Sequence, residues 1–211
     1  RIGMAKIHKF QDDITEEVAN SLKESIGIDV EATGLQIPER DKLSLIQICD
    51  QNGVVYIIQP DRKNYKAPNL VKVLEDASIL KIGHYLRFDK SALEFFLKCK
   101  IKSIFDTKIA SKVVRTYTDQ HGLKSLAYEF CNKNLDKRSG SSDWNKDINE
   151  LSDKQLEYAA NDVIFLHKIK SELEKMLKRE NRMDLYKNCI TFLDTRIKLD
   201  QSGFKFDVFE H

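Results

Sequence analysis

One short stretch of the sequence, residues 26–35, reads IGIDVEATGL and places two acidic residues inside an apolar run. Side chains two apart in a β-strand point to the same face, so Asp29 and Glu31 are expected to project together. Aspartate is depleted in strands, and two carboxylates on one face repel each other unless a cation lies between them. The pattern therefore indicates a site for hard divalent cations such as Mg²⁺, which prefer oxygen ligands. The alternative is a solvent-facing edge strand that carries two acids without special function.

Length and composition favour one cytoplasmic domain. The chain has 211 residues, 41% of them hydrophobic, and only three prolines. At roughly 100–200 residues per domain this predicts one domain, with at most a short helical addition. No apolar run approaches the ~20 residues of a membrane span. The four cysteines lack CxxC spacing, which is typical of reduced thiols rather than of a disulfide framework or a zinc site.

The net charge of +2 says little about nucleic acid on its own. It suits a modestly basic surface around an acidic, metal-filled pocket. It does not suit a protein that clamps long duplexes, because such binding requires many phosphate contacts.

The first third of the chain predicts an antiparallel meander. A short strand over residues 6–10 and an acidic helix over 12–25 precede the strand that carries Asp29. Two further β-rich runs, 43–50 and 53–58, are joined by a Gln-Asn-Gly turn of the hairpin type. The three strands from Asp29 onward are therefore expected to pair in sequence order.

The pattern then changes to alternating helices and strands. The expected elements are a helix from Pro68 to residue 76, a strand over 79–84, a helix over 88–98, a strand over 101–105 and a helix over 108–115. From Gly122 onward the pattern is helical, apart from a polar loop over 132–143. A meander followed by such an alternation predicts an α/β fold, a mixed sheet with antiparallel and parallel strands flanked by helices.

Three more residues carry candidate chemistry. Asp89 follows a short strand at the start of a helix, where chain ends commonly line a site in α/β sheets. Tyr158 and Asp162 lie four apart on a predicted helix and hence on one face. Taken singly, Asp89 is an acid favoured at a helix start, and the other two are a core aromatic and a solvated charge.

Taken together, these residues resemble the three motifs of the DEDDy family of 3′→5′ exonucleases. The residue types, their order, their spacing and their predicted elements all agree. Similarity to the ribonuclease D branch extends over four further segments: 105–111 (FDTKIAS), 121–126 (HGLKSL), 142–144 (SDW) and 156–163 (LEYAANDV).

Residues 115–124 and 203–211 are similar to the compact nanoRNase C-type proteins of alphaproteobacteria. Ribonuclease D proper carries helical nucleic-acid-binding domains after its exonuclease domain, and no such accessory domain is expected here. The resemblance implies a ribonuclease H-like DEDD fold, with an exonuclease domain over residues 4–180. Residues 181–211 are expected to form a helical or extended segment that packs on the domain or at a subunit interface.

The resemblance also implies the chemistry. Asp29, Glu31, Asp89 and Asp162 are expected to bind two Mg²⁺ or Mn²⁺ ions that activate a water and stabilise charge on the attacking and leaving oxygens. Tyr158 is expected to position that water. Its ordinary pKa of about 10 argues against its acting as the base unaided. The product would be a 5′-mononucleotide released from the 3′ end.

The sequence departs from the family pattern at two places beside the motif acids. Val30 and Ala32 stand where Thr is often found, and their side chains are expected to face away from the metals. Tyr85 and Leu86 stand where the wider superfamily often has Asn or Gly, so substrate contacts there are not carried over.

Candidate substrate contacts surround the acids. Leu35 occupies the place where the family uses an apolar wedge between terminal bases, the alternative being a core leucine. Thr33 and His84 are candidates for contact with the terminal sugar or base. The remaining candidates are Gly34, in the turn, and four loop residues that could contact phosphate or simply be solvated: Lys137, Arg138, Ser141 and Ser142. Trp144 is expected to be a core anchor.

The implied substrate is short single-stranded RNA, dinucleotides above all, and the implied assembly is a ring-like homo-octamer. A general ribonuclease D-like enzyme that trims RNA 3′ ends is the nearest alternative, and a DNA-trimming exonuclease is a weaker form of it. The alternative from another class is a non-catalytic RNA-binding module. Four acids around one point argue against that module.

Overall fold

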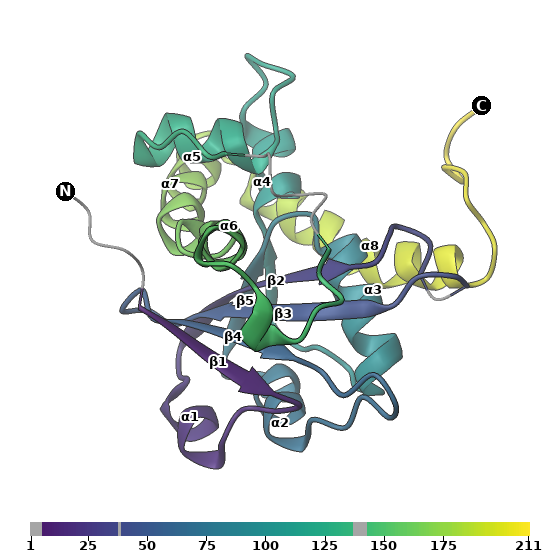
Figure 1. Cartoon of the computed structure of the whole chain (residues 1–211). Coiled ribbons are helices and arrows are strands. Elements are labelled where there is room, and N and C mark those ends of the chain that lie inside the picture. The colour runs from purple at the N-terminus through teal and green to yellow at the C-terminus, as the bar shows by residue number, and fades with distance from the viewer. Residues whose placement is uncertain (1–5, 38, 137–142) are drawn as a thin grey trace.

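The computed structural model describes residues 6–37, 39–136 and 143–211. Its centre is a mixed sheet of six strands in the order β1-β4-β3-β2-β5-β6 (Figure 1). The strands are β1 (Ile7–Gln11), β2 (Ser25–Ala32), β3 (Leu43–Cys49), β4 (Val55–Gln59), β5 (Leu80–Gly83) and β6 (Ile104–Asp106). Strands β2, β3 and β4 pair antiparallel, which confirms the meander. Strand β1 joins β4 in parallel, and β5 and β6 extend the sheet in parallel beyond β2.

Helices cover both faces of this sheet. They are α1 (Glu16–Ser21), α2 (Pro68–Glu75), α3 (Leu86–Leu97), α4 (Thr107–Val114), α5 (Leu123–Cys131), α6 (Asp153–Asn161), α7 (Leu166–Arg179) and α8 (Met183–Gln201), with a 3₁₀ turn, η1 (Ile148–Glu150). In Figure 1, α1 and α2 lie below the sheet, and α5, α6 and α7 lie above it. The expectation of a mixed sheet flanked by helices is confirmed.

Two predicted boundaries are wrong for local reasons. The acidic helix expected over 12–25 is only Glu16–Ser21. Asp12 has a φ of 69°, and the Asp13 carboxylate accepts the N–H of Leu70 at 2.9 Å, so it serves the start of α2 instead. The strand expected over 101–105 begins only at Ile104, because Ser103 has a φ of 64° that a strand cannot contain.

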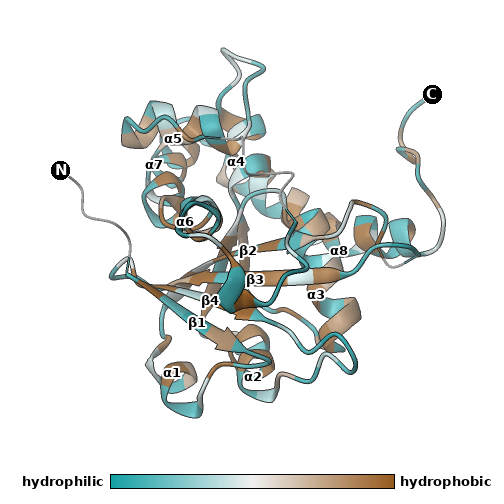
Figure 2. Ribbon diagram, viewed as in Figure 1, coloured by the Kyte–Doolittle hydropathy of each residue, from teal (hydrophilic) through white to brown (hydrophobic). Residues whose placement is uncertain are grey.

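Alternation along the strands divides the core into two layers. In the first layer, Ile28 and Val30 face α1, α2 and α3. In the second layer, Leu45 and Ile57 face α4 to α7. Figure 2 shows the hydrophobic residues concentrated in the central strands. Since Asp29 lies between Ile28 and Val30 in the strand, its side chain belongs to the second layer, beneath α6 and α7.

Helix α8 packs back on the sheet and on α3. Its residues Leu193 and Ile197 are buried in the first layer. Asp200 near its end forms a bidentate ion pair with Arg87 of α3, with both nitrogen–oxygen distances at 2.7 Å. Among the described residues, none of the helices combines the length and the apolar character that crossing a bilayer requires.

Candidate active site

The acidic pair on β2 faces an acid from α6. Oxygens of Asp29, Glu31 and Asp162 all lie within 4.8 Å of one another, and each side chain is partly exposed. The two β2 side chains share a face because they are two residues apart, as the sequence predicted. Asp162 directly follows α6, where the chain keeps helical dihedral angles at the helix C-cap. Strand and helix thus bring three carboxylates to one point.

Asp89 adds a fourth carboxylate from α3 and is only 3% exposed. Burial, and then the negative charge of Glu31, raises the pKa of Asp89 well above its ordinary value. Burial, and then the charge of Asp89, does the same to the pKa of Asp29. These mutual effects place all four predicted acids in one site. An oxygen-only donor set that repels itself fits hard divalent cations, which would remove the repulsion on binding.

The position of Asp89 depends on a buried carboxylate at the start of α4. Asp106 accepts the N–H of Lys108 at 2.8 Å and so caps α4. It also accepts the N–H of Leu86 at 2.8 Å and that of Tyr85 at 3.3 Å. Asp106 therefore caps α3 as well, and it fixes the helix turn that carries Asp89. This second role was missed, because the sequence does not show that two helices start side by side.

Tyr158 lies one turn before Asp162 on α6. Ser152 and Gln155 start this helix with a reciprocal capping box. Burial, followed by the charge of Asp162, raises the pKa of Tyr158, so the phenol belongs to the acidic site. The Trp144 ring stacks on it with centroids 6.0 Å apart. Trp144 is buried, which agrees with the predicted core anchor.

Leu35, a predicted substrate contact, lies in the loop after β2. It is 84% exposed, which excludes the alternative of a core leucine. The hydroxyl of Thr33 donates to Asp41 Oδ1 at 3.1 Å and is therefore used inside the same loop. The Gln36 N–H donates to Asp41 Oδ2 at 2.9 Å. A Cβ on Gly34 would lie 2.5 Å from Asp41 Oδ2, so only glycine fits against this carboxylate.

Asp41 thus organises the loop that presents Leu35, a role that was not predicted from the sequence. Nothing local distinguishes this acid from other polar loop residues. His84 is fixed differently: its Nδ1 lies 2.9 Å from the Thr107 hydroxyl. The four candidate phosphate contacts lie outside the described residues: Lys137, Arg138, Ser141 and Ser142.

A second residue of the site that was not predicted from the sequence is Gln47 of β3. It pairs in register with Asp29, and its side chain is fully buried on the same sheet face. Its Nε2 donates toward Glu31 Oε1 at 3.2 Å. The sequence signal that could have indicated Gln47 is a polar amide within the largely apolar strand Leu43–Cys49, whose residues are all buried.

Comparisons with known proteins agree with this geometry. A family model described as a 3′-5′ exonuclease matches residues 5–178. DNA polymerase I of Aquifex aeolicus is 33% identical over 152 residues, which make up 71% of this chain and 24% of that protein. Ribonuclease D of Gluconacetobacter diazotrophicus is 29% identical over 143 residues, 68% of this chain and 35% of that protein. The chain therefore spans about a quarter to a third of these curated relatives.

Solved structures of NrnC from Brucella melitensis match over the whole length. One superimposes with a TM-score of 0.91 at 41% identity and covers 98% of both chains. The same protein was solved with bound Mg²⁺ (TM-score 0.89, 40% identity, 98% of this chain and 99% of that one). It was also solved bound to pGG (TM-score 0.90, 41% identity, 98% of both chains). The chain belongs to the 3′-5′ exonuclease family, with the ribonuclease H-like fold and with relatives in the ribonuclease D and NrnC groups.

Proposed function

We propose that the protein is a metal-dependent 3′→5′ exoribonuclease that hydrolyses short oligoribonucleotides, dinucleotides above all, to 5′-mononucleotides. The observation that carries the proposal is the convergence of four carboxylates and one phenol in a single site. The end-to-end similarity to an NrnC that was solved with bound pGG supports the choice of a short substrate.

The acids would hold two divalent cations, Mg²⁺ or Mn²⁺. When bound, such a pair lowers the pKa of a water and neutralises charge on the attacking and leaving oxygens. Asp29, Glu31, Asp89 and Asp162 supply the oxygen ligands from β2, α3 and the end of α6. Because three of these carboxylates are partly exposed, the site is open to a phosphodiester from solvent.

Tyr158 acts as a hydrogen-bond donor that orients the attacking water. Its raised pKa keeps the phenol protonated at neutral pH, so it does not serve as the base. The stacked ring of Trp144 limits its rotation. Leu35, held out from the domain by its loop, lies against the terminal bases as a wedge, and Gly34 lets that loop close on Asp41. Thr33 serves the terminal nucleotide through its backbone, since its hydroxyl donates to Asp41. His84, whose Nδ1 contacts the Thr107 hydroxyl, serves it through its backbone or its ring.

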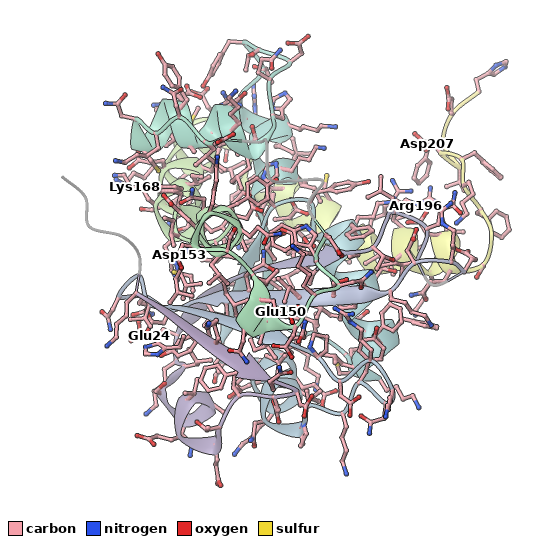
Figure 3. The ribbon with its side chains drawn as sticks, viewed as in Figure 1. Glu24, Glu150, Asp153, Lys168, Arg196 and Asp207 are labelled. Carbon is pink, nitrogen blue, oxygen red and sulfur yellow. The ribbon has the colours of Figure 1, made fainter. Side chains whose placement is uncertain are left out.

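The C-terminal part is assigned to assembly. We propose an exonuclease domain over residues 4–180 and a segment over 181–211 that contributes to a homo-oligomer in the cytoplasm, an octamer by resemblance. Phe206 and Phe209 are exposed at 60% and 77%. Arg196 of α8 donates to the Phe206 carbonyl at 2.8 Å, and Figure 3 shows it beside the segment that carries Asp207. A segment with exposed aromatic rings that is tied to α8 through Arg196 suits contact with a second copy of the chain.

A general ribonuclease D-like enzyme is the second candidate, favoured by the similarity to ribonuclease D over two thirds of the chain. A time course with Mg²⁺ on a 5′-labelled dinucleotide and a 5′-labelled RNA of about twenty nucleotides separates the two. Preferential cleavage of the dinucleotide supports the proposal, and equal or better trimming of the longer RNA supports the second candidate. Asp29→Ala should abolish turnover of both substrates. Binding without hydrolysis by the wild type would point to a non-catalytic module.

A further inference from the structure

We propose that Gln47 is a positioning residue that sets the cation affinity of the site. Its amide orients the carboxylates of Asp29 and Glu31 and connects them to α6. The inference rests on the proposed function only through the divalent-cation site, and it holds whichever nucleic acid is cut.

The contacts of one nitrogen carry the inference. Gln47 Nε2 lies 3.2 Å from Glu31 Oε1, 3.4 Å from Asp29 Oδ2 and 3.3 Å from the carbonyl oxygen of Ala159. Ala159 directly follows Tyr158 on α6. All three neighbours are acceptors, so the donor end of the amide must face them. One side chain therefore contacts both motif acids of β2 and the backbone of the helix that carries the remaining motif.

Burial of this amide costs folding free energy, and a role in the site would account for its presence. Gln47 is fully buried, and its Oε1 has no hydrogen-bond partner among the residues that the structure describes. Burying an unpaired polar oxygen costs free energy that an apolar residue of the same size would avoid. The residues that flank Gln47 on the same sheet face, Leu45 and Cys49, are buried in the apolar core, so this face of β3 accepts apolar side chains. The amide nitrogen is what distinguishes Gln47 from them.

An amide suits this place better than a charged donor or acceptor. A lysine would offer its own positive charge to the acids and compete with cations, whereas a glutamate would add a further negative charge to four that already repel one another. A neutral donor leaves the charge of the ligand set unchanged and restricts its rotation. Hydrogen-bonded neighbours of this kind orient metal ligands, and their removal typically lowers metal affinity by about 10–100-fold.

The test compares two buried glutamines. Gln47→Met removes the amide but keeps a side chain of similar size. Gln47→Asn keeps an amide but shortens the side chain by one methylene, which withdraws the donor from the three acceptors. Gln59→Met is the matched control on the adjacent strand β4, where Nε2 donates to the Lys146 carbonyl at 2.6 Å and Oε1 accepts the Ile148 N–H at 3.1 Å. Mn²⁺ binding is measured by calorimetry and by electron paramagnetic resonance, and folding by circular dichroism.

We expect both Gln47 variants to bind Mn²⁺ about 10–100-fold more weakly than the wild type. Their kcat on a dinucleotide should recover in part at high Mn²⁺, and Gln59→Met should bind Mn²⁺ normally. Unchanged Mn²⁺ affinity in the folded Gln47→Asn variant, or an equal loss in Gln59→Met, would overturn the inference. If the wild type binds Mn²⁺ but cleaves no RNA, the proposed function fails while the role of Gln47 is still decided by the binding data.

Discussion

Replacing Asp29 by asparagine should stabilise the metal-free protein while abolishing its activity. The four acids are gathered on separate elements, and without cations they repel one another. Asn keeps the size and most of the hydrogen-bonding capacity of Asp but removes one negative charge. The expected gain in the free energy of unfolding is therefore the repulsion energy that this charge causes, reduced by the part that solvent already screens.

The distances set the size of this gain. Asp29 has oxygens within 4.8 Å of those of Glu31 and Asp162. Two unit charges at that separation repel by roughly 3–4 kcal/mol at an effective dielectric constant near 20. Because the side chains are partly exposed and can take up a proton, we expect a net gain of about 1–2 kcal/mol. For a chain of this size, this corresponds to a rise in Tm of roughly 2–8 °C.

The pH dependence follows from the same charges. Burial and neighbouring carboxylates raise the pKa values of Asp29 and Asp89 above those of the unfolded chain. The metal-free fold therefore binds more protons than the unfolded state, and its stability is lost as the pH rises through the raised pKa values. Saturating Mg²⁺ should oppose this loss, because cations bind the deprotonated carboxylates. Asp29→Asn should show a flatter profile without metal.

Thermal melting followed by circular dichroism checks both the stability gain and its pH dependence. The melts are recorded over a series of pH values, with EDTA or with Mg²⁺. Glu157→Gln is the matched control, because it removes an exposed acid on α6 that lies next to Tyr158 in the sequence. A metal-free Asp29→Asn variant that melts at or below the wild-type temperature would contradict the expected repulsion among the acids. So would a wild type whose metal-free stability rises with pH in the range where the two acids titrate.

Three further changes test other parts of the site. Tyr158→Phe should lower kcat about 100-fold with Mn²⁺ affinity unchanged, because the attacking water loses the donor that orients it, as measured by steady-state kinetics and calorimetry. A double-mutant cycle on kcat/KM for a dinucleotide tests whether Asp41 acts through Leu35. Asp41→Ala should lower kcat/KM in the wild type but have little effect in a Leu35→Ala background. Independent effects of the two substitutions would contradict the role of Asp41 in presenting Leu35. Asp106→Ala should lower the Tm by several degrees and weaken Mn²⁺ binding, because it removes the caps of two helices, whereas Asp106→Asn should retain part of both.

Local periodicity made much of the site predictable. Alternation within a strand places Asp29 and Glu31 on one face, and helical spacing brings Tyr158 and Asp162 together, whatever the rest of the chain does. The N-cap at Asp106 could be predicted for α4 because a cap concerns residues two or three positions away. Each of these inferences depends on a few neighbouring residues, and each agrees with the structure.

The parts that were missed depend on pairing across the chain. The contact of Gln47 with Asp29 exists only because β2 and β3 pair in that register. Asp13 stays outside α1 because its carboxylate caps α2, more than fifty residues away. Asp41 becomes special only when its loop closes on Gly34. None of these relations has a periodic signal in the sequence.

Buried polar groups that serve two elements at once join the predicted parts into one site. Asp106 links the starts of α3 and α4, and Gln47 links β2 to α6. Each therefore controls a distance between acids that local propensity leaves open. A mutual repulsion of the four acids would otherwise separate these elements, so the metal-free site needs uncharged or backbone-directed hydrogen bonds to stay assembled. This explains why the connecting groups are an amide and a carboxylate paired with N–H groups, rather than lysine or arginine side chains that would compete with the cations.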